Sequence, residues 1–100
     1  MVEFERAVLV TMKTGKLIFG SESAVEAARS GKAKMIVVAS NCPEPVKARI
    51  RAYAALSGVP VHEYNGSSLD LGSICQKPFI VSAITVREPG DSDIMKLVQS

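Results

Sequence analysis

The residues best suited to chemistry are scattered along this chain and form no recognisable catalytic cluster. His62, the single histidine, lies in an alternating segment, which is typical of a surface-facing strand residue. The two cysteines are too few and too far apart for a disulfide scaffold or a four-ligand zinc site, so we interpret Cys75 as a core residue and Cys42 as an ordinary loop thiol. Neither a Walker-type phosphate loop nor a nucleophile elbow is present. We therefore expect a protein that is not an enzyme and that needs no cofactor.

Two short stretches carry groups suited to binding a ligand. In Gly20–Ser23, backbone amides, two hydroxyls and a carboxylate converge at the start of an expected helix, although simple helix capping would also explain these residue types. In Lys77–Phe79, an aromatic ring follows a cation and a proline just before an expected strand, where a core phenylalanine is the simpler interpretation. Taken singly, neither stretch defines a site.

The elements that must position these stretches begin with a compact strand, helix and strand within residues 15–41. Lys16–Phe19 and Met35–Ala39 are apolar runs typical of strands, and the second should be buried on both faces. Between them, Ser23 and Glu26 have the spacing of a capping box, and Gly31 ends the helix. Two strands joined in this way pack as a right-handed parallel crossover, which leaves the Gly20–Ser23 turn at the carboxyl end of a strand, where open sheets usually place their sites.

The rest of the chain continues to alternate between helix and strand. Spacing and caps predict helices at residues 3–14 and 45–57, a short helix opened by Ser67 with Asp70 as its capping acid, and a final helix over residues 91–99. Further strands are expected at residues 59–64 and 79–86. The order of elements predicts an α/β protein, a three-layer α/β/α sandwich around a small sheet.

Composition limits the size and the environment of the protein. One hundred residues, of which 47% are hydrophobic and 22% charged, fit one domain spanning residues 1–100. The longest apolar run is far too short to cross a bilayer, and no secretory signal is recognisable, so we expect a cytoplasmic protein with no membrane partner. A net charge of +2 is a mild bias, and any binding of nucleic acid would need a local constellation of groups.

Several segments together resemble the kink-turn RNA-binding ribosomal proteins of archaea and eukaryotes, in particular those of the large subunit. The segments that carry the likeness occur in the family's order and at its spacing over essentially the whole chain: Gly20–Ser23, Ile36–Asn41, Tyr53–Val61, Leu69–Gly72 and Pro89–Ser92. The resemblance implies a four-stranded mixed sheet in the order 1-4-2-3, with the last strand antiparallel, between layers of helices.

The resemblance also implies an RNA site. Its expected residues are Gly20, Ser21, Glu22, Ser23, Asn41, Lys47, Lys77 and Phe79. By this likeness, the backbone at Gly20 and the start of the next helix approach tandem sheared G·A pairs, Asn41 adds polar contacts, and Phe79 stacks on an extruded base. Phosphate contacts would come from Lys47 and Lys77, with Lys16 and Lys32, or partly from backbone amides. Splayed nucleotides are read by stacking and by hydrogen bonds to base edges, which suits such a compact surface.

The sequence departs from the family pattern at Glu22, where relatives often have a basic residue or asparagine, and beside it at Ser23 and Val46. A carboxylate repels phosphates but can accept hydrogen bonds from a guanine edge, so both signs of its effect stay open. We expect a structural constituent of the large ribosomal subunit that binds ribosomal RNA at a kink-turn, monomeric when free and with neighbouring ribosomal proteins as possible partners. The alternatives are a free kink-turn regulator or ribonucleoprotein component, and a protein-interaction module on the same fold.

Overall fold

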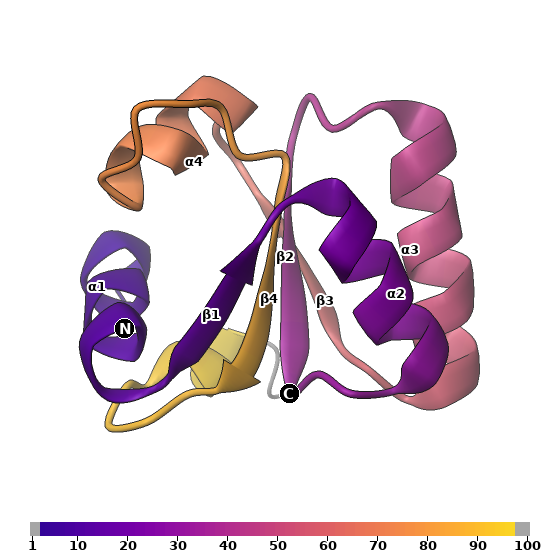
Figure 1. Cartoon of the computed structure of the whole chain (residues 1–100), viewed down its shortest axis with the longest axis horizontal. Coiled ribbons are helices and arrows are strands. Elements are labelled where there is room, and N and C mark those ends of the chain that lie inside the picture. The colour runs from indigo at the N-terminus through magenta and orange to yellow at the C-terminus, as the bar shows by residue number, and fades with distance from the viewer. Residues whose placement is uncertain (1–2, 98–100) are drawn as a thin grey trace.

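The computed structural model describes residues 3–97 and contains one four-stranded mixed sheet (Figure 1). Across the sheet the strands follow the order β1 (Lys16–Phe19), β4 (Ala83–Glu88), β2 (Met35–Ala39) and β3 (Val61–Tyr64). Strand β4 runs antiparallel to both of its neighbours, whereas β2 and β3 are parallel. The predicted sheet order and the antiparallel last strand are therefore confirmed.

Helices cover both faces of this sheet, as predicted for a three-layer sandwich (Figure 1). On one face lie α2 (Ser21–Ser30) and α3 (Glu44–Ser57). On the other lie α1 (Phe4–Thr14), α4 (Ser68–Ile74) and the 3₁₀ helix η1 (Ile94–Leu97). Each face has its own apolar core, and β2 contributes to both.

Strand β2 is the centre of both cores because all of its side chains are apolar. Every residue from Met35 to Ala39 is fully buried. Met35, Val37 and Ala39 pack in the core below α1 and α4, whereas Ile36 and Val38 pack below α2 and α3. Each large side chain buried in this way stabilises the fold by about 1.5–3 kcal/mol.

The two predicted capping boxes had different outcomes. At the start of α4, the Asp70 amide donates to Ser67 Oγ at 3.2 Å, and the Ser67 amide donates to Asp70 Oδ2 at 3.1 Å, so this box is confirmed. The box predicted from Ser23 and Glu26 is wrong. Helix α2 already begins at Ser21, which places Ser23 inside its first turn, and Glu26 instead pairs with Arg29.

Several other predicted boundaries also differ from the structure. Helix α3 begins at Glu44, one residue early, and β3 begins only at Val61, after Pro60. Strand β4 spans Ala83–Glu88 and not residues 79–86, because residues 79–82 pass over α4 before they reach the sheet. Of the helix predicted over residues 91–99, the structure contains η1 at Ile94–Leu97, and residues 98 and 99 lie outside the described part of the chain.

Both thiols are buried. Cys75 is fully buried in the core, as predicted, and burial raises its pKa to about 11. Cys42 lies in the turn between β2 and α3, yet only 3% of it is exposed, and burial raises its pKa as well. Cys42 thus lies in a loop as predicted, but its side chain is packed below the surface, which the sequence did not indicate.

The prediction that His62 is a surface-facing strand residue is confirmed only in part, because the side chain is half-buried. Its ring lies 5.9 Å from the ring of Phe4, measured between centroids, and the same Phe4 ring stacks on Tyr64 at 4.6 Å. His62 and Tyr64 are two residues apart on β3 and share one face of the sheet, and Phe4, the first residue of α1, packs against both rings. Partial burial under this helix lowers the pKa of His62.

We expect this histidine to make the protein less stable in mild acid. The unfolded chain takes up the His62 proton near pH 6.5, whereas the folded chain takes it up only at lower pH. The contribution to stability is complete above pH 6.5 and is lost as the pH falls from there through the folded pKa. Urea unfolding at pH 7.5 and pH 5.5 should show this loss, and His62→Gln should reduce the difference between the two pH values. An identical pH dependence in both proteins would contradict it.

Candidate RNA interface

Three connections meet at one end of the sheet, which we call the site end. They are the β1–α2 turn at Gly20, the β2–α3 turn at residues 40–43, and the α4–β4 segment at residues 75–82, all at the top of Figure 1. Backbone bonds hold them together: the Gly20 amide donates to Ala83 O at 2.9 Å, and the Ala39 amide donates to Ser82 O at 2.9 Å. The predicted site residues from these three connections are thus brought to one end of the molecule.

Helix α2 begins at the site end without a capping side chain. Its N-cap is Gly20, whose φ of +113° is a conformation that residues with a side chain rarely adopt. The first amides of a helix have no partner within the helix, and they carry the positive end of its dipole. Glu22 and Ser23 are exposed in this first turn, and Ser21 is half-buried. The turn therefore offers backbone N–H donors, hydroxyls and one carboxylate to a ligand.

Asn41 connects the β2–α3 turn to α4. Its Oδ1 accepts a hydrogen bond from the Ser68 amide at 2.7 Å, although the residue itself is exposed. Because the side-chain oxygen is engaged, the group that Asn41 can offer to a ligand is its NH₂, a donor of two hydrogen bonds. The sequence pointed to Asn41 as a polar contact but gave no sign of this structural bond.

The Phe79 ring is exposed beside α4 and is not a core side chain. It is 54% exposed, and its backbone packs directly against Gly72. Leu69 is 65% exposed and Ile80 is 62% exposed, and they flank the hydrogen bond from the Val81 amide to Ser68 O. These three side chains, Leu69, Phe79 and Ile80, form what we call the apolar patch. Exposed patches of this kind commonly mark binding surfaces.

Sequence reasoning missed two members of this patch. The sequence places Leu69 and Leu71 on the same short helix, and no exposed side chain was predicted there. Residues two apart on a helix cannot point the same way, and with Leu71 fully buried this spacing could have identified Leu69 as exposed. For Ile80 no comparable signal exists, because its apolar neighbours suggested a strand.

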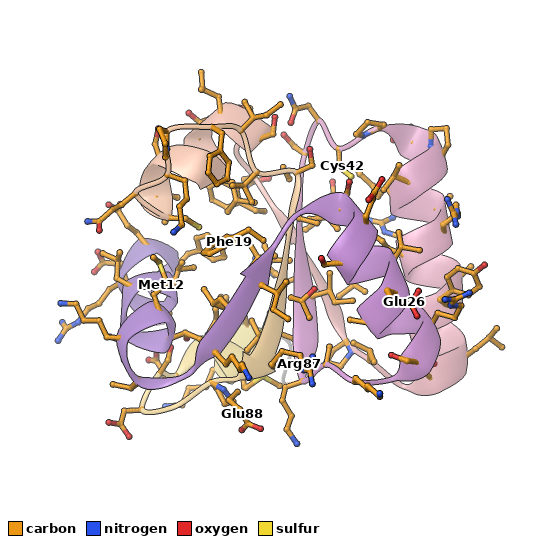
Figure 2. The ribbon with its side chains drawn as sticks, in the orientation of Figure 1. Met12, Phe19, Glu26, Cys42, Arg87 and Glu88 are labelled. Carbon is orange, nitrogen blue, oxygen red and sulfur yellow. The ribbon has the colours of Figure 1, made fainter. Side chains whose placement is uncertain are left out.

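Lys77 also lies at the site end, where its ammonium contacts an aromatic ring. Nζ lies 4.9 Å from the centroid of the Phe19 ring, which β1 directs toward the α1 and α4 side of the sheet (Figure 2). Such a contact is worth about 0.5–1 kcal/mol at exposed sites. Lys77 is half-buried there, so its charge is fixed close to the α4–β4 segment.

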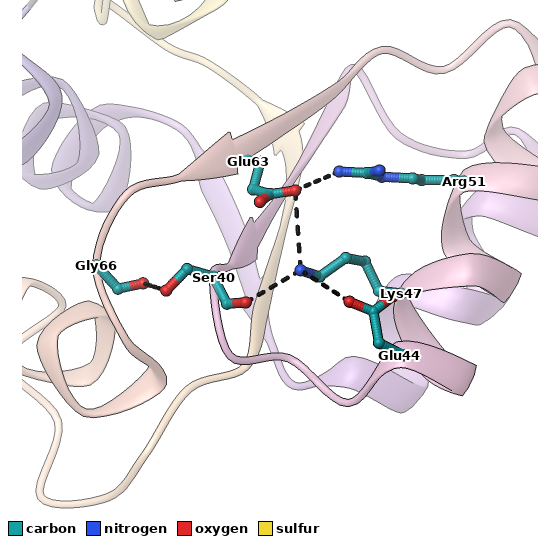
Figure 3. Close-up of polar contacts among 6 residues, drawn as sticks. All are labelled: Ser40, Glu44, Lys47, Arg51, Glu63 and Gly66. Carbon is teal, nitrogen blue, oxygen red and sulfur yellow. Dashed lines mark hydrogen bonds and ion pairs between the residues drawn. The ribbon is translucent and has the colours of Figure 1, made fainter.

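Lys47 has a different role from the predicted contact with phosphate. It is only 5% exposed, and its Nζ donates to Ser40 O at 3.0 Å (Figure 3). Glu63 and Glu44 lie 3.8 and 3.9 Å from the same nitrogen, and Arg51 also pairs with Glu63. Burial and these partners correct the expectation of a direct phosphate contact: Lys47 holds the turn that carries Asn41.

Two other cations expected at the site lie elsewhere. Lys16 begins β1, whereas Gly20 follows the end of that strand, so the two are separated by about 13 Å of extended chain. Lys32 lies in the α2–β2 connection at the same distant end (Figure 1). Lys16 and Lys32 therefore lie at the other end of the sheet from Gly20, and their contacts with phosphates stay a prediction.

Within residues 3–97, no helix is both long enough and apolar enough to span a membrane. No group of three or more His, Cys, Asp or Glu side chains in this range is arranged to hold a metal ion.

Comparison with known proteins assigns the class to which this fold and site belong. Residues 3–96 match the family model described as the ribosomal protein L7Ae/L30e/S12e/Gadd45 family, and the chain belongs to this family. Three similar curated relatives are each named large ribosomal subunit protein eL30. The protein of Methanosphaera stadtmanae is 46% identical over 96 residues, which cover 96% of this chain and 98% of the relative. Those of Methanothermobacter thermautotrophicus and Sulfurisphaera tokodaii are 42% and 40% identical, over 97% and 96% of this chain and 99% and 91% of the relatives.

A solved structure supports the fold alone. A protein of unknown function from Bacillus halodurans superimposes with a TM-score of 0.76, covering 98% of this chain and 97% of its own, at 17% sequence identity. The resemblance to ribosomal proteins seen in the sequence is thus confirmed by the family match and the relatives, and the sandwich architecture recurs in a distant protein.

Proposed function

We propose that this chain is a structural constituent of the large ribosomal subunit that binds ribosomal RNA at a kink-turn or a similar internal loop. It acts as one domain spanning residues 1–100, is a monomer when free, and works on the cytoplasmic ribosome without catalytic chemistry or a cofactor. The family and the names of the relatives support the ribosomal part of this proposal. The observation that carries the RNA part is the exposed Phe79 ring at the same end of the sheet as the uncapped start of α2.

The proposed contacts follow from the donors and surfaces at the site end. The amides at the start of α2, with the Ser21 and Ser23 hydroxyls, donate to the bases and backbone of the sheared G·A pairs. Glu22 accepts from the guanine edge, where N–H groups are available. Phe79 stacks on a base turned out of the helix, with the rest of the apolar patch beside it. Asn41 adds N–H donors and Lys77 adds a positive charge.

Lys47 acts as a positioning residue, because it holds the β2–α3 turn that carries Asn41. Its bonds to the β2–α3 turn and to Glu63 join α3, β3 and that turn through one buried nitrogen. The turn therefore keeps its shape without RNA, and the Asn41 amide stays beside the first turn of α4. The proposed RNA contacts are accordingly Gly20, Ser21, Glu22, Ser23, Asn41, Lys77 and Phe79.

A comparison of two RNAs tests this function directly. One RNA carries a kink-turn, and the other is identical except that Watson–Crick pairs replace its G·A pairs. We expect at least tenfold tighter binding of the kink-turn RNA, because a straight helix cannot present an extruded base to Phe79 while the G·A pairs meet α2. Equal affinity for both would reject specific recognition and favour a protein-interaction module on this fold.

Sedimentation separates the ribosomal role from that of a free regulator. We expect the chain to sediment with large subunits and to remain there at moderate salt. A chain that binds the kink-turn RNA but stays in the soluble fraction would instead act off the ribosome, as a regulator or as part of another ribonucleoprotein.

A further inference from the structure

Four basic residues lie at the end of the sheet opposite the site end, where Lys16 is paired across the sheet with Glu88. They are Lys16, Lys32, Lys34 and Arg87, which we call the far basic cluster. They come from the start of β1, the α2–β2 connection and the end of β4. Figure 2 shows Arg87 at this lower end, far from Cys42 at the site end. Two of these cations, Lys16 and Lys32, were expected to contact phosphates, and the structure places both of them away from the site end.

The backbone fixes three of these cations next to one another. The Lys34 amide donates to Val86 O at 2.8 Å, which places Lys34 beside the residue that precedes Arg87. The Lys32 amide donates to Ala27 O at 3.1 Å and so stays close to the end of α2. Two shallow hollows of about 290 and 240 Å³ adjoin these cations, and Lys32 and Arg87 line both of them. The first hollow runs along α2 from Lys32 to Ser23, whereas the second, which Lys34 also lines, stays at the far end. The cluster therefore has a defined shape, although its lysines are exposed.

The cluster carries a net positive charge. Among residues 3–97, Arg29 pairs with Glu26, Lys47 pairs with Glu44 and Glu63, and Arg51 pairs with Glu63. None of these ion pairs involves a cation of the far basic cluster. Two acids line the hollows, and one of them, Glu26, is already paired with Arg29. Glu88 is the other. Cations without acidic partners repel one another, and a ligand with several negative charges would relieve this repulsion.

The geometry points to a second RNA-binding surface: the far basic cluster holds the phosphate backbone of another RNA segment while the site end holds the first. The inference extends the proposed function, and the chain would then join two parts of the RNA across its sheet. An RNA backbone fits better than an acidic protein, because no exposed large apolar side chain lines either hollow. Protein interfaces are usually anchored by such side chains, whereas phosphates need only flexible cations.

The test uses the full chain and a straight RNA duplex as the second ligand. Binding of the labelled duplex is measured on the free protein and on protein saturated with unlabelled kink-turn RNA. We expect the duplex to bind the saturated protein, which would exclude simple competition for the site end. In the variant with Lys32→Gln and Lys34→Gln, affinity for the duplex should fall by about tenfold or more at low salt. The slope of log affinity against log salt should decrease by about two, and kink-turn binding should change little.

The matched control removes two exposed lysines from the elements that cover the other face of the sheet. Lys13→Gln with Lys96→Gln lowers the net charge equally, on α1 and η1. An equal loss of duplex binding in the control would reduce the effect to bulk charge and overturn the proposal. Unchanged duplex binding in the Lys32 and Lys34 variant would overturn it too, as would displacement of the duplex by kink-turn RNA. If the cluster binds a polyglutamate peptide more tightly than the duplex, the proposal is overturned, and the ligand of the cluster is an acidic protein.

The two proposals can fail independently. If the kink-turn RNA does not bind, the proposed function fails. Duplex binding by the two double variants, measured without kink-turn RNA, still shows whether the far basic cluster binds RNA. If kink-turn RNA binds and the duplex does not, the proposed function stands without a second surface.

Discussion

Phe79→Ala should weaken binding of a kink-turn RNA by about 5- to 150-fold and leave the fold intact. Stacking of a base on an aromatic side chain is worth about 1–3 kcal/mol, which corresponds to this range of affinity. The ring is 54% exposed, so its removal leaves no buried cavity, and the free energy of unfolding should change little. Titration of labelled RNA and urea unfolding of the same preparations measure the two effects.

Two further variants make this prediction specific to stacking. Phe79→Trp keeps a flat aromatic face and should retain most of the affinity. Leu56→Ala removes another exposed apolar side chain, 86% accessible and near the end of α3, and should have no effect on RNA binding. Wild-type affinity in Phe79→Ala would show that the ring does not contact the RNA.

Gly72→Ala should lower both stability and RNA affinity, although it places a better helix former in α4. In an ordinary helix interior this change is favourable by about 1 kcal/mol. Here a Cβ on residue 72 would lie 2.3 Å from Phe79 O, and a backbone oxygen cannot move without the segment that carries it. Such overpacking typically costs about 1–3 kcal/mol, so we expect the clash to outweigh the gain. The displaced segment carries the Phe79 ring, and RNA binding should fall with stability.

Ser73→Ala is the matched control, because Ser73 is the exposed neighbour in the same helix. It should be neutral or slightly stabilising, with unchanged affinity. Thermal unfolding and RNA titration of both variants would separate the effect of helix propensity from the effect of the contact between residue 72 and Phe79 O. A Gly72→Ala protein as stable as Ser73→Ala and with normal affinity would mean that the α4–β4 segment adapts without loss.

The sequence predicted best those features that rest on local chemistry. The apolar run Met35–Ala39 marked the central strand, and Ser67 with Asp70 marked the start of α4, because burial on both faces and a reciprocal cap each need particular residue types. The strand order came from the family resemblance, since no local pattern specifies which strands become neighbours.

Its errors occurred where long-range contacts decide the outcome. Residues 79–82 have the composition of a strand, but their packing on Gly72 keeps them above α4 and exposes the ring at position 79. Lys47 has the residue type of a surface cation, yet Ser40 O and Glu63, from distant parts of the chain, surround its ammonium. The positions of Lys16 and Lys32 depended on strand direction, and the same direction that brings Gly20 and Ser82 together carries these lysines to the other end.

The buried ammonium of Lys47 also affects which partner bears the conformational cost of the proposed RNA binding. Because it holds the β2–α3 turn without RNA, the protein has little conformational entropy to lose there on association. The cost of adopting the bound shape then falls on the nucleic acid. Apparent affinity scales with the fraction of RNA that is already bent, so ions that favour bending would tighten the complex without touching the protein.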